Sequence, residues 1–289
     1  MRELERNAAH NRSRMPAAAG TRRIGIVGRG RLGHALAAGL REAGLEVDGP
    51  LGRAEAPTGE AIVLCVPDRE IALAARAVAG GGAAYVGHTS GATPLSALEP
   101  ARAAGASVFG LHPLQTFAAE DRTPPLEHFA GAGCAVAGST PDAVRLATDI
   151  ARTLGMEPFA LDDEGRAAYH AAASIASNFL LTLQAAAESV AAAAGLEAAD
   201  ARRLLAPLVR TTVETWCERG PVAALTGPVA RGDEATVAAQ REAVERSEPD
   251  LLPLFDALVE RTRALAASGE RPLAGSQARS LARVGGAPA

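Results

Sequence analysis

The sequence predicts an α/β domain with a doubly wound sheet, followed by an all-helical domain. Short apolar runs typical of strands alternate with helix-like segments over residues 22–161. The strand signals then stop, and alanine- and leucine-rich helical segments fill residues 162–267. The ends, residues 1–21 and 268–289, are polar and contain Gly and Pro, so we expect two loose tails.

Charge and hydropathy limit the classes of partner. The formal net charge is −4, and the chain has no dense basic run, which argues against a nucleic-acid or anionic membrane surface. No apolar run reaches the roughly 18 residues that a membrane helix needs. The polar first segment lacks the apolar middle of a secretion signal. We therefore expect a cytoplasmic protein with a small-molecule substrate.

Lysine and cysteine usage excludes several chemistries. All 29 basic residues are arginine, so a lysine Schiff base, a P-loop lysine and a lysine general acid are excluded. The three cysteines, Cys65, Cys134 and Cys217, are far apart and odd in number, which fits neither a disulfide framework nor a zinc site. We expect all three to be small core residues in a reducing compartment, and we expect no metal site.

The first element is the stretch "RRIGIVGRGRLGHALAAGL" at residues 22–40. An apolar strand leads into a GxGxxG turn, formed by Gly28, Gly30 and Gly33, and then into a helix. This order is that of a Rossmann-like dinucleotide site, in which the helix amino terminus offers N–H groups to a pyrophosphate. A tight strand-to-helix turn without a ligand is the alternative. The expected cofactor contacts here are Gly28, Arg29, Gly30, Arg31, Leu32 and Gly33.

The end of the second strand, "LEVDGPLGR", indicates which dinucleotide binds. The usual spacing of about 20 residues falls on Asp48, whose carboxylate would accept from ribose hydroxyls. However, we expect the strand to end near Leu51, which leaves Gly52 and Arg53 facing the ribose. Arg53 could pair with a 2′-phosphate, so the sequence favours NADP(H), unless Arg53 is a solvated loop residue.

Further strands are predicted at "AIVLCVPD", "AAYVGHTSG", "SVFGLHP", "GCAVAG" and "EPFAL", with Asp68 capping the helix after the first of them. Ligands of open α/β sheets bind beyond the carboxyl ends of the strands. The residues placed there are the cofactor candidates Val66, Pro67, Thr89, Ser90 and Gly91, the histidines His88 and His112, and the substrate candidate Gln115.

The helical region is predicted to break near Gly195, near Gly220 and at "LTGPVARGD". Its first helix, over residues 163–194, is small or apolar around most of its circumference, as expected of a buried helix. The exception is one polar stripe at helical spacing, which predicts a cleft wall or, alternatively, hydrogen bonds between helices. The stripe consists of Arg166, His170, Ser174, Ser177 and Asn178.

Three motifs, "GLHPLQTF", "YHAAASIASNFL" and "LTGPVARGD", follow the glycine turn and "VPD" in this order. In this, the chain resembles over about residues 22–265 a bacterial family of candidate NADP oxidoreductases. Its members pair a Rossmann-like domain with a helical domain of formerly unknown function, within the 6-phosphogluconate dehydrogenase-like superfamily. Superfamily relatives reduce small keto acids or cyclic imines, and some members look like ketopantoate reductases.

Many superfamily relatives use a lysine as the general acid, and this chain has no lysine. The proton donor is therefore expected to be another residue. His112 and His170 are the candidates, because imidazole titrates near neutral pH. The "GLHP" string is also similar to a prephenate dehydrogenase motif whose histidine contacts the substrate hydroxyl; a turn histidine before a proline is the alternative. Ser174 and Asn178 would hold the substrate carbonyl, and Arg166 or Arg231 its carboxylate.

The function that these patterns favour is NADPH-dependent reduction of a small 2-keto acid, ketopantoate-like, or of an imine. A prephenate-type dehydrogenase and a non-catalytic NADP(H)-sensing module remain alternatives. The apolar first helix and the resemblance both suggest a homodimer through the helical domain. In that dimer Gly227 and Pro228 would turn the chain, Asp233 would cap the next helix, and Arg231 would reach the partner's pocket; a simple helix-to-helix turn is the alternative.

Overall fold

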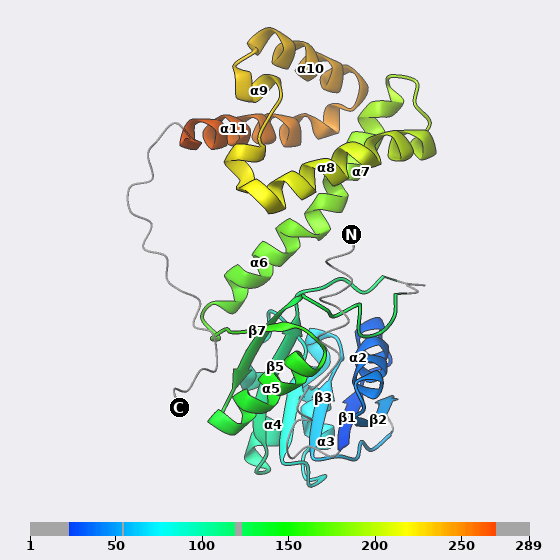
Figure 1. The fold of residues 1–289 in the computed structure, drawn as a ribbon, viewed down its shortest axis with the longest axis vertical. Coiled ribbons are helices and arrows are strands. Elements are labelled where there is room, and N and C mark those ends of the chain that lie inside the picture. Colours follow the sequence, from blue (N-terminus) through cyan, green and yellow to red (C-terminus); the bar gives the residue numbers. More distant parts are fainter. Residues whose placement is uncertain (1–22, 54, 119–122, 270–289) are drawn as a thin grey trace, which may run out of the picture. The chain divides into compact units, whose positions relative to one another are not determined.

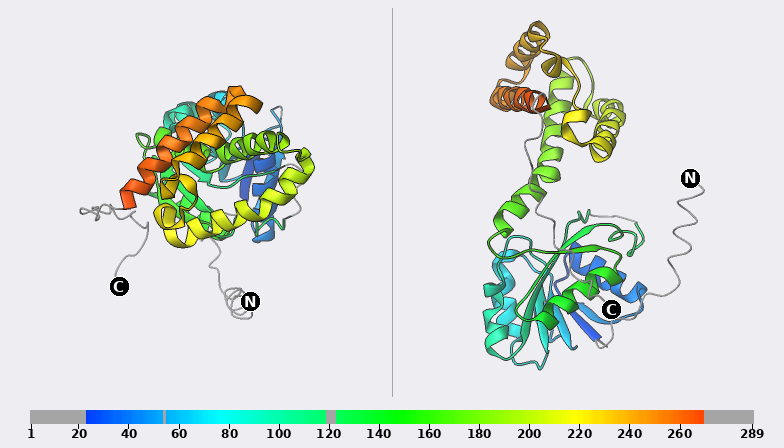
Figure 2. Two further views of the ribbon diagram at one scale, coloured as in Figure 1. Left: turned by 90° about the horizontal axis from the view of Figure 1, so that it is seen from above. Right: turned by 60° about the vertical axis from the view of Figure 1, so that its left-hand side comes forward.

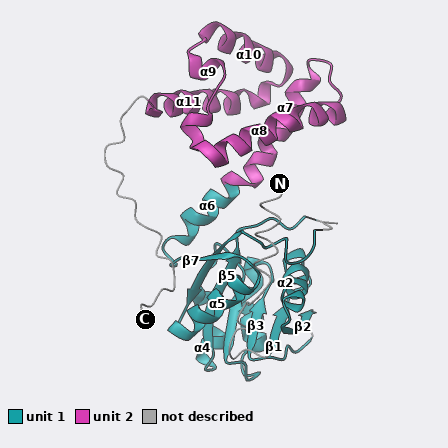
Figure 3. Cartoon of the chain, viewed as in Figure 1, with its two compact units in different colours: residues 1–174, 280–289 teal, residues 175–279 magenta. Residues whose placement is uncertain are grey.

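The structure is a computed structural model and describes residues 23–53, 55–118 and 123–269 (Figure 1). Among these residues the chain forms two compact units, the first ending at Ser174 and the second beginning at Ile175 (Figure 3). The sequence-based boundary lies earlier, between residues 161 and 162. The predicted tail at residues 1–21, and all but the first two residues of the one at 268–289, lie outside the described residues.

The first unit is built on a seven-stranded sheet with strand order β2-β1-β3-β4-β5-β6-β7. All neighbouring strands are parallel except β5 and β6, which are antiparallel. The predicted α/β class with a Rossmann-like sheet is confirmed. The strands are β1 (Arg23–Val27), β2 (Glu46–Leu51), β3 (Ala61–Leu64), β4 (Tyr85–His88), β5 (Ser107–Pro113), β6 (Gly133–Gly138) and β7 (Glu157–Ala160).

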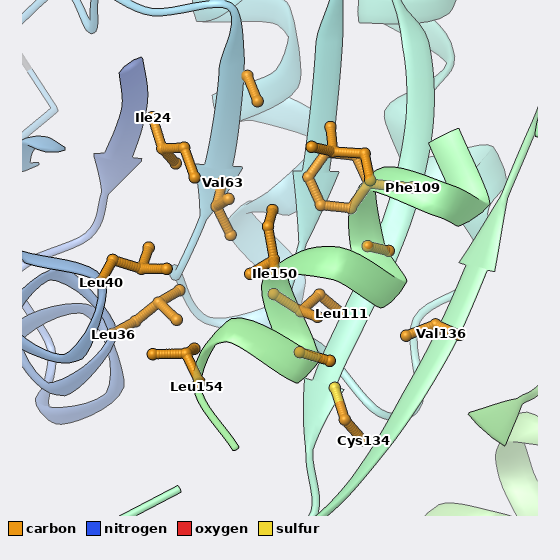
Figure 4. Packing of buried hydrophobic residues seen from close by; sticks show 14 of the residues in the cluster. Ile24, Leu36, Leu40, Val63, Phe109, Leu111, Cys134, Val136, Ile150 and Leu154 are labelled. Atoms are coloured by element: carbon orange, nitrogen blue, oxygen red, sulfur yellow. The ribbon is translucent and has the colours of Figure 1, made fainter. Parts of the chain in front are cut away.

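Apolar residues on both faces of the strands explain why helices cover both sides of this sheet. On one face, Leu36 and Leu40 of α2 (Arg31–Glu42) and Ile150 of α5 (Pro141–Thr153) pack with strand residues such as Val63 and Phe109 (Figure 4). The other face packs against α3 (Ile71–Val78) and α4 (Glu99–Ala103). Each fully buried Leu, Ile or Phe contributes roughly 1.5–3 kcal/mol.

The strand order places a topological switch beside β1. From β1 the chain goes to β2 on one side and then returns to β3 on the other side. In open α/β sheets the crevice at such a point, beyond the carboxyl ends of the strands, is the usual ligand site. The glycine turn follows β1, and Val66 and Pro67 follow β3, so both segments border this crevice.

The rest of the described chain is helical, with breaks where the glycines predict them. Gly195 has φ 82° after α7, Gly220 has φ 75° within α8, and Gly227 has φ 102° before α9. Helices α10 and α11 lie side by side (Figure 2). Within the described residues, no helix combines the length and apolarity needed to cross a membrane. The helices are α6 (Arg166–Ala176), α7 (Asn178–Ala192), α8 (Ala198–Ala224), α9 (Pro228–Arg231), α10 (Glu234–Ser247) and α11 (Leu252–Gly269).

The single long helix predicted over residues 163–194 is wrong, because the structure has two helices there. α6 ends at Ala176 and α7 begins at Asn178, with Ser177 between them at φ −119° and ψ −74°. Ser and Asn side chains compete with the backbone for hydrogen bonds, which weakens a helix at such a pair. Every residue of α7 is described and none is buried, and Phe179 is 55% exposed.

Two smaller predictions are also wrong. Asp68 does not cap α3, because it begins a 3₁₀ turn (Asp68–Glu70) that precedes the helix, and the Glu70 N–H donates to the Pro67 carbonyl. Cys217 is exposed, since α8 buries only Ala201 in the described chain. Cys65 and Cys134 are buried as expected.

Candidate functional site

The three glycines of the turn after β1 have three different surroundings. A Cβ on Gly28 would lie 2.1 Å from the Cys65 carbonyl oxygen, and Gly28 has φ 120°, where side chains are rare. A Cβ on Gly33 would lie 2.0 Å from the Gly28 carbonyl oxygen. A Cβ on Gly30 would meet no described atom within 4 Å. The first and third glycines therefore allow close packing, while the second leaves its backbone open to a ligand.

The helix that begins after this turn can receive an anion. Gly30 is the N-cap residue of α2 and supplies no side-chain cap, and the first turn of the helix contains no acidic residue. The free N–H groups of the first turn and the helix dipole both favour a negatively charged group at this position. Arg29 and Arg31 flank Gly30, and both side chains are exposed. The turn thus fits a dinucleotide pyrophosphate in shape and in charge.

The second strand ends at Leu51, as the sequence predicts. Asp48 lies within the strand, opposite Gly25, and its carboxylate accepts from the Thr58 N–H at 2.7 Å and from the Thr58 hydroxyl. These hydrogen bonds lower the pKa of Asp48. Gly52 and Arg53 follow the strand, and the Arg53 side chain is 80% exposed. Of the two candidates, Arg53 rather than Asp48 is placed where the strand ends.

A cavity of about 410 Å³ opens next to this strand end. Its volume lies in the range of small-molecule pockets. The wall toward α3 is apolar, whereas the side toward β2 carries arginine and glutamate. Val66 is the member of the cavity that the sequence predicted at the end of β3. The lining residues are Val27, Gly52, Arg53, Glu55, Ala56, Pro57, Val66, Glu70, Leu73, Ala74, Ala77 and Val78.

The loop after β4 is held by its own polar groups. The Ser90 hydroxyl accepts from the N–H groups of Ala92 and Thr93 at 3.2 and 2.9 Å, and the Ser90 N–H donates to His88 Nδ1 at 3.2 Å. The Thr89 N–H donates to the Leu64 carbonyl at 3.2 Å. These side chains are buried, so they shape the loop and present its backbone.

His112, Tyr169 and His170 form the chemical centre of the first unit. His112 Nδ1 and the Tyr169 hydroxyl are 2.7 Å apart, and the two rings meet edge to face. The imidazoles of His112 and His170 have their centroids 6.0 Å apart. His170 Nδ1 is buried, with no hydrogen-bond partner in the described chain. The structure therefore brings together the two histidines that the sequence names as candidate proton donors.

Gly91 makes room for this cluster. A Cβ on Gly91 would lie 2.9 Å from His112 Nε2 and 2.9 Å from His170 Nδ1. Both nitrogen atoms thus face the backbone of the loop after β4. Because that loop lies at the carboxyl ends of the parallel strands, the imidazoles are at the edge of the sheet where ligands bind.

Arg166 lies beneath the cluster and is 3% exposed. Its Nε donates to Asp163 Oδ1 at 2.6 Å, and the Asp163 carboxylate also accepts from the Leu95 N–H at 3.2 Å. A Cβ on Gly110 would lie 3.0 Å from Arg166 Nη2, so β5 has to be bare at that point. The ion pair lies within the segment that begins α6, and the Asp163–Leu95 hydrogen bond joins this segment to the chain that follows β4. Arg166 is thus a buried cation near the histidines.

This environment keeps two imidazoles neutral. Burial, and then the Arg166 guanidinium, lower the pKa of His88 to about 4. Burial, the neighbouring His170 and Arg166 lower the pKa of His112 to about 4. Burial raises the pKa of the Tyr169 hydroxyl. At neutral pH the site therefore contains uncharged imidazoles and a protonated tyrosine.

Gln115 and Ser174, two further residues of the sequence-based site, belong to the first unit. Gln115 is exposed, and its side-chain oxygen accepts from the Thr116 N–H at 2.8 Å. Ser174 is half-buried at the last position of the first unit. Asn178 and Arg231 belong to the second unit. The spacing argument that joined Asn178 to Arg166 fails because the helix breaks at Ser177.

The predicted turn at Gly227 and Pro228 and the predicted cap at Asp233 are confirmed, whereas the predicted position of Arg231 at the start of the next helix is wrong. Gly227 and Pro228 begin α9, and the Asp233 carboxylate caps α10 by accepting from the Thr236 N–H at 3.1 Å. Arg231 ends α9 and does not begin α10.

The sequence analysis missed Tyr169. Its position was available, because Tyr169 is three residues after Arg166 and so lies on the same helix face as the polar stripe. The polar stripe was defined without Tyr169, because the aromatic ring of Tyr169 was counted as apolar. Asp163 was missed for a different reason: its role depends on contact with Leu95, 68 residues earlier in the chain.

A known family matches the second part of the chain, and the match begins within the sheet, just before β6. Residues 132–262 match the family described as "Domain of unknown function (DUF2520)". This confirms the sequence resemblance over β6, β7 and most of the helical region. No curated protein matches the chain.

Solved structures match most of the chain and support the fold. A candidate NADP oxidoreductase from Bacteroides fragilis is 20% identical with a TM-score of 0.71, covering 86% of this chain and 100% of that one. A Thermotoga maritima protein is 24% identical with a TM-score of 0.67 and the same coverage. A reductive aminase from Aspergillus terreus, in complex with NADPH and ethyl levulinate, is 20% identical with a TM-score of 0.55, covering 86% and 99%. All three share the two-part fold of this chain.

Proposed function

We propose that this protein is an NADPH-dependent reductase of a small 2-keto acid or imine, with His112 as the group that transfers the proton. The observation that carries the proposal is the His112–Tyr169–His170 cluster beside Gly91. It lies at the carboxyl edge of a sheet whose first turn leaves Gly30 open for a dinucleotide. The similar reductive aminase was solved with NADPH and a keto ester, which supports the same class.

The cofactor site is proposed from the residues that fit it. The open backbone at Gly30 and the amino terminus of α2 would hold the pyrophosphate, and Arg53 would pair with the 2′-phosphate. When bound, the nicotinamide supplies the hydride. Arg53→Ala is expected to remove most of the preference for NADPH over NADH. The remaining contacts would come from Gly28, Arg29, Arg31, Leu32, Gly33, Gly52, Val66, Pro67, Thr89, Ser90 and Gly91.

His112 is suited to hold a proton at Nε2. Its Nδ1 is engaged by the Tyr169 hydroxyl, so this hydrogen bond fixes the tautomer and the ring orientation. If the hydroxyl donates to Nδ1, the proton of the neutral ring is on Nε2, the atom near Gly91 and His170. A substrate oxygen or nitrogen at that position would accept a hydrogen bond from Nε2. The imidazolium form of His112 would transfer the proton and return to the neutral ring.

The substrate contacts complete the proposal. Of the two arginines proposed for a carboxylate, Arg166 belongs to the same unit as His112 and lowers the pKa of that histidine, although its Nε is already paired with Asp163. Ser174, Asn178, Gln115 and Arg231 remain proposed contacts. We further propose that the protein acts in the cytoplasm as a homodimer through its helical unit, since Phe179, Leu208 and other large apolar side chains there are exposed.

The direct test is consumption of NADPH with a panel of 2-keto acids and imines. His112→Ala is expected to lower turnover by roughly 10²–10⁴-fold and to leave the dissociation constant for NADPH almost unchanged. His170→Ala is made in parallel, because the two imidazoles share the site. Undiminished turnover in both variants would reject histidine catalysis.

One observation favours a second candidate, oxidation of a hydroxy acid by a prephenate-type reaction. With a pKa of about 4, His112 is a free base at neutral pH and could accept a proton from a substrate hydroxyl. Oxidation would then be independent of pH above about 5, whereas reduction by protonated His112 would slow about tenfold per pH unit in that range. Rates measured in both directions between pH 5 and 8 separate the two. Tight NADP(H) binding without turnover in either direction would instead favour the non-catalytic sensing module.

A further inference from the structure

Two arginines beside the cavity at the end of β2 are each paired with a carboxylate of the same chain. Arg29 Nη2 donates to Glu55 Oε2 at 2.6 Å, and Arg53 pairs with Glu70. The Arg29 and Glu55 side chains are 60% and 44% exposed, so this pair is accessible to a solute. The cationic groups that would attract a phosphate are therefore already neutralised in the free protein.

The Glu55 carboxylate has the surroundings of a bound anion. Besides Arg29, its Oε2 atom accepts from the Gly52 backbone N–H at 2.6 Å. A Cβ on Gly52 would lie 3.1 Å from this oxygen, a tight contact that the glycine avoids. A guanidinium together with a backbone N–H is the donor set that phosphate groups bind.

We propose that the Glu55 carboxylate occupies, in the free protein, the place that the cofactor's 2′-phosphate takes on binding. This inference rests on the proposed NADP(H) site. Glu55, Gly52 and Arg53 all line the cavity at the end of β2, whose opposite wall is the apolar side of α3. An adenine ring against that wall would direct its ribose toward Glu55. The 2′-phosphate would displace the carboxylate and take over Arg29 and the Gly52 N–H.

This exchange gives Glu55 control over cofactor choice. A ligand with a 2′-phosphate has to compete with Glu55, whereas a ligand without one does not. The selectivity for NADPH over NADH is then lower than the two arginines alone would give. A substitution that neutralises Glu55 should raise the selectivity for NADPH over NADH.

The test uses adenosine 2′,5′-bisphosphate and AMP as probes, with dissociation constants measured by calorimetry on the full chain. Glu55→Gln is expected to tighten the bisphosphate about tenfold, by removing one competing charge-assisted pair, and to change AMP less than twofold. Glu46→Gln makes the same charge change at the opposite end of β2 and is expected to alter neither. Adding Arg29→Ala to Glu55→Gln should remove the gain.

The outcomes separate this inference from the function on which it rests. If neither probe binds to the unmodified protein, the proposed cofactor site is wrong. If both bind and Glu55→Gln leaves their ratio unchanged, the cofactor site stands and the inference is overturned. Weaker AMP binding in Glu55→Gln would also overturn it, since Glu55 would then hold the ribose hydroxyls.

Discussion

The hydrogen bond between His112 and Tyr169 makes the orientation and tautomer of His112 depend on Tyr169. Tyr169 approaches the ring of His112 from the nitrogen opposite the one proposed to face the substrate. It is therefore a positioning residue, because it acts through His112. Its own pKa is raised by burial, so it stays protonated at any pH where the protein works.

Tyr169→Phe should release the tautomer of His112 while keeping the aromatic packing. We expect turnover to fall about tenfold, the size of effect that one hydrogen bond of about 1.4 kcal/mol produces. Nitrogen-15 NMR of His112 should show one tautomer in the unmodified protein and a mixture in the variant. One unchanged tautomer in the variant would show that Tyr169 only packs there.

His88 makes folding stability depend on pH. Its pKa is about 4 in the folded protein against an ordinary value of 6.5, so below pH 6.5 the unfolded chain binds the proton more readily. Stability is then complete above pH 6.5 and is lost as the pH falls toward 4, by on the order of 2 kcal/mol at pH 4.5.

Urea unfolding of His88→Gln at pH 7 and 4.5 checks this prediction. The variant is expected to be less stable than the unmodified protein at pH 7 and to show a smaller difference between the two pH values. His34→Gln, at an exposed position of α2, is the control. An equal pH dependence in the unmodified protein and His88→Gln would contradict the role of His88.

Single residues were predictable from the sequence where their neighbours in the chain define their role. His112 and His170 could be selected because each is a titratable side chain in a motif. Glu55 could not, because the approach of Arg29 across 26 residues is decided only when β1 and β2 pair. Arg166 was expected to bind a substrate carboxylate. In the structure its buried guanidinium forms an ion pair with Asp163.

At the scale of elements, the glycine turn offers a paired prediction. Gly30→Ala adds a methyl group in open space, so folding should be unaffected, and the cofactor pyrophosphate should bind at least about tenfold more weakly. Gly33→Ala puts a methyl group against the Gly28 carbonyl and should lower the free energy of unfolding by roughly 2 kcal/mol or more. Thermal melting and NADPH titration of the two variants distinguish them. Equal effects of both on melting would contradict the assignment.

The central strands were predicted well because β1, β3, β4 and β5 are short, mostly apolar runs that are largely buried in the sheet. The helix over residues 163–194 was not, because its apolar composition hides the break at Ser177. Composition predicts how apolar this helix is, and covering of part of it by a second copy stays a prediction. In a single chain Ile175, Phe179 and Leu181 are exposed.

For the whole molecule, these exposed side chains motivate the proposed dimer. Side chains such as Leu181, which is 69% exposed, would be covered by a second copy. Light scattering at micromolar concentration is expected to give twice the monomer mass, and Leu181→Asp to shift the protein toward the monomer. Leu114→Asp, on the first unit, should leave the mass unchanged. A monomer in the unmodified protein would remove the dimer and the proposed action of Arg231 across an interface.

The family match that begins at residue 132 has a practical consequence for anyone who expresses part of this gene. The matched stretch starts just before β6, which pairs with β5. It also includes α5, whose Ile150 packs, together with Leu154 just after the helix, into the core that the earlier strands share. A fragment cut at the limits of the match would expose to water the edge of β6 that pairs with β5 and the apolar face of α5. We therefore expect that residues 132–262, which the family match covers, do not fold alone, and that expression of this fragment yields aggregates.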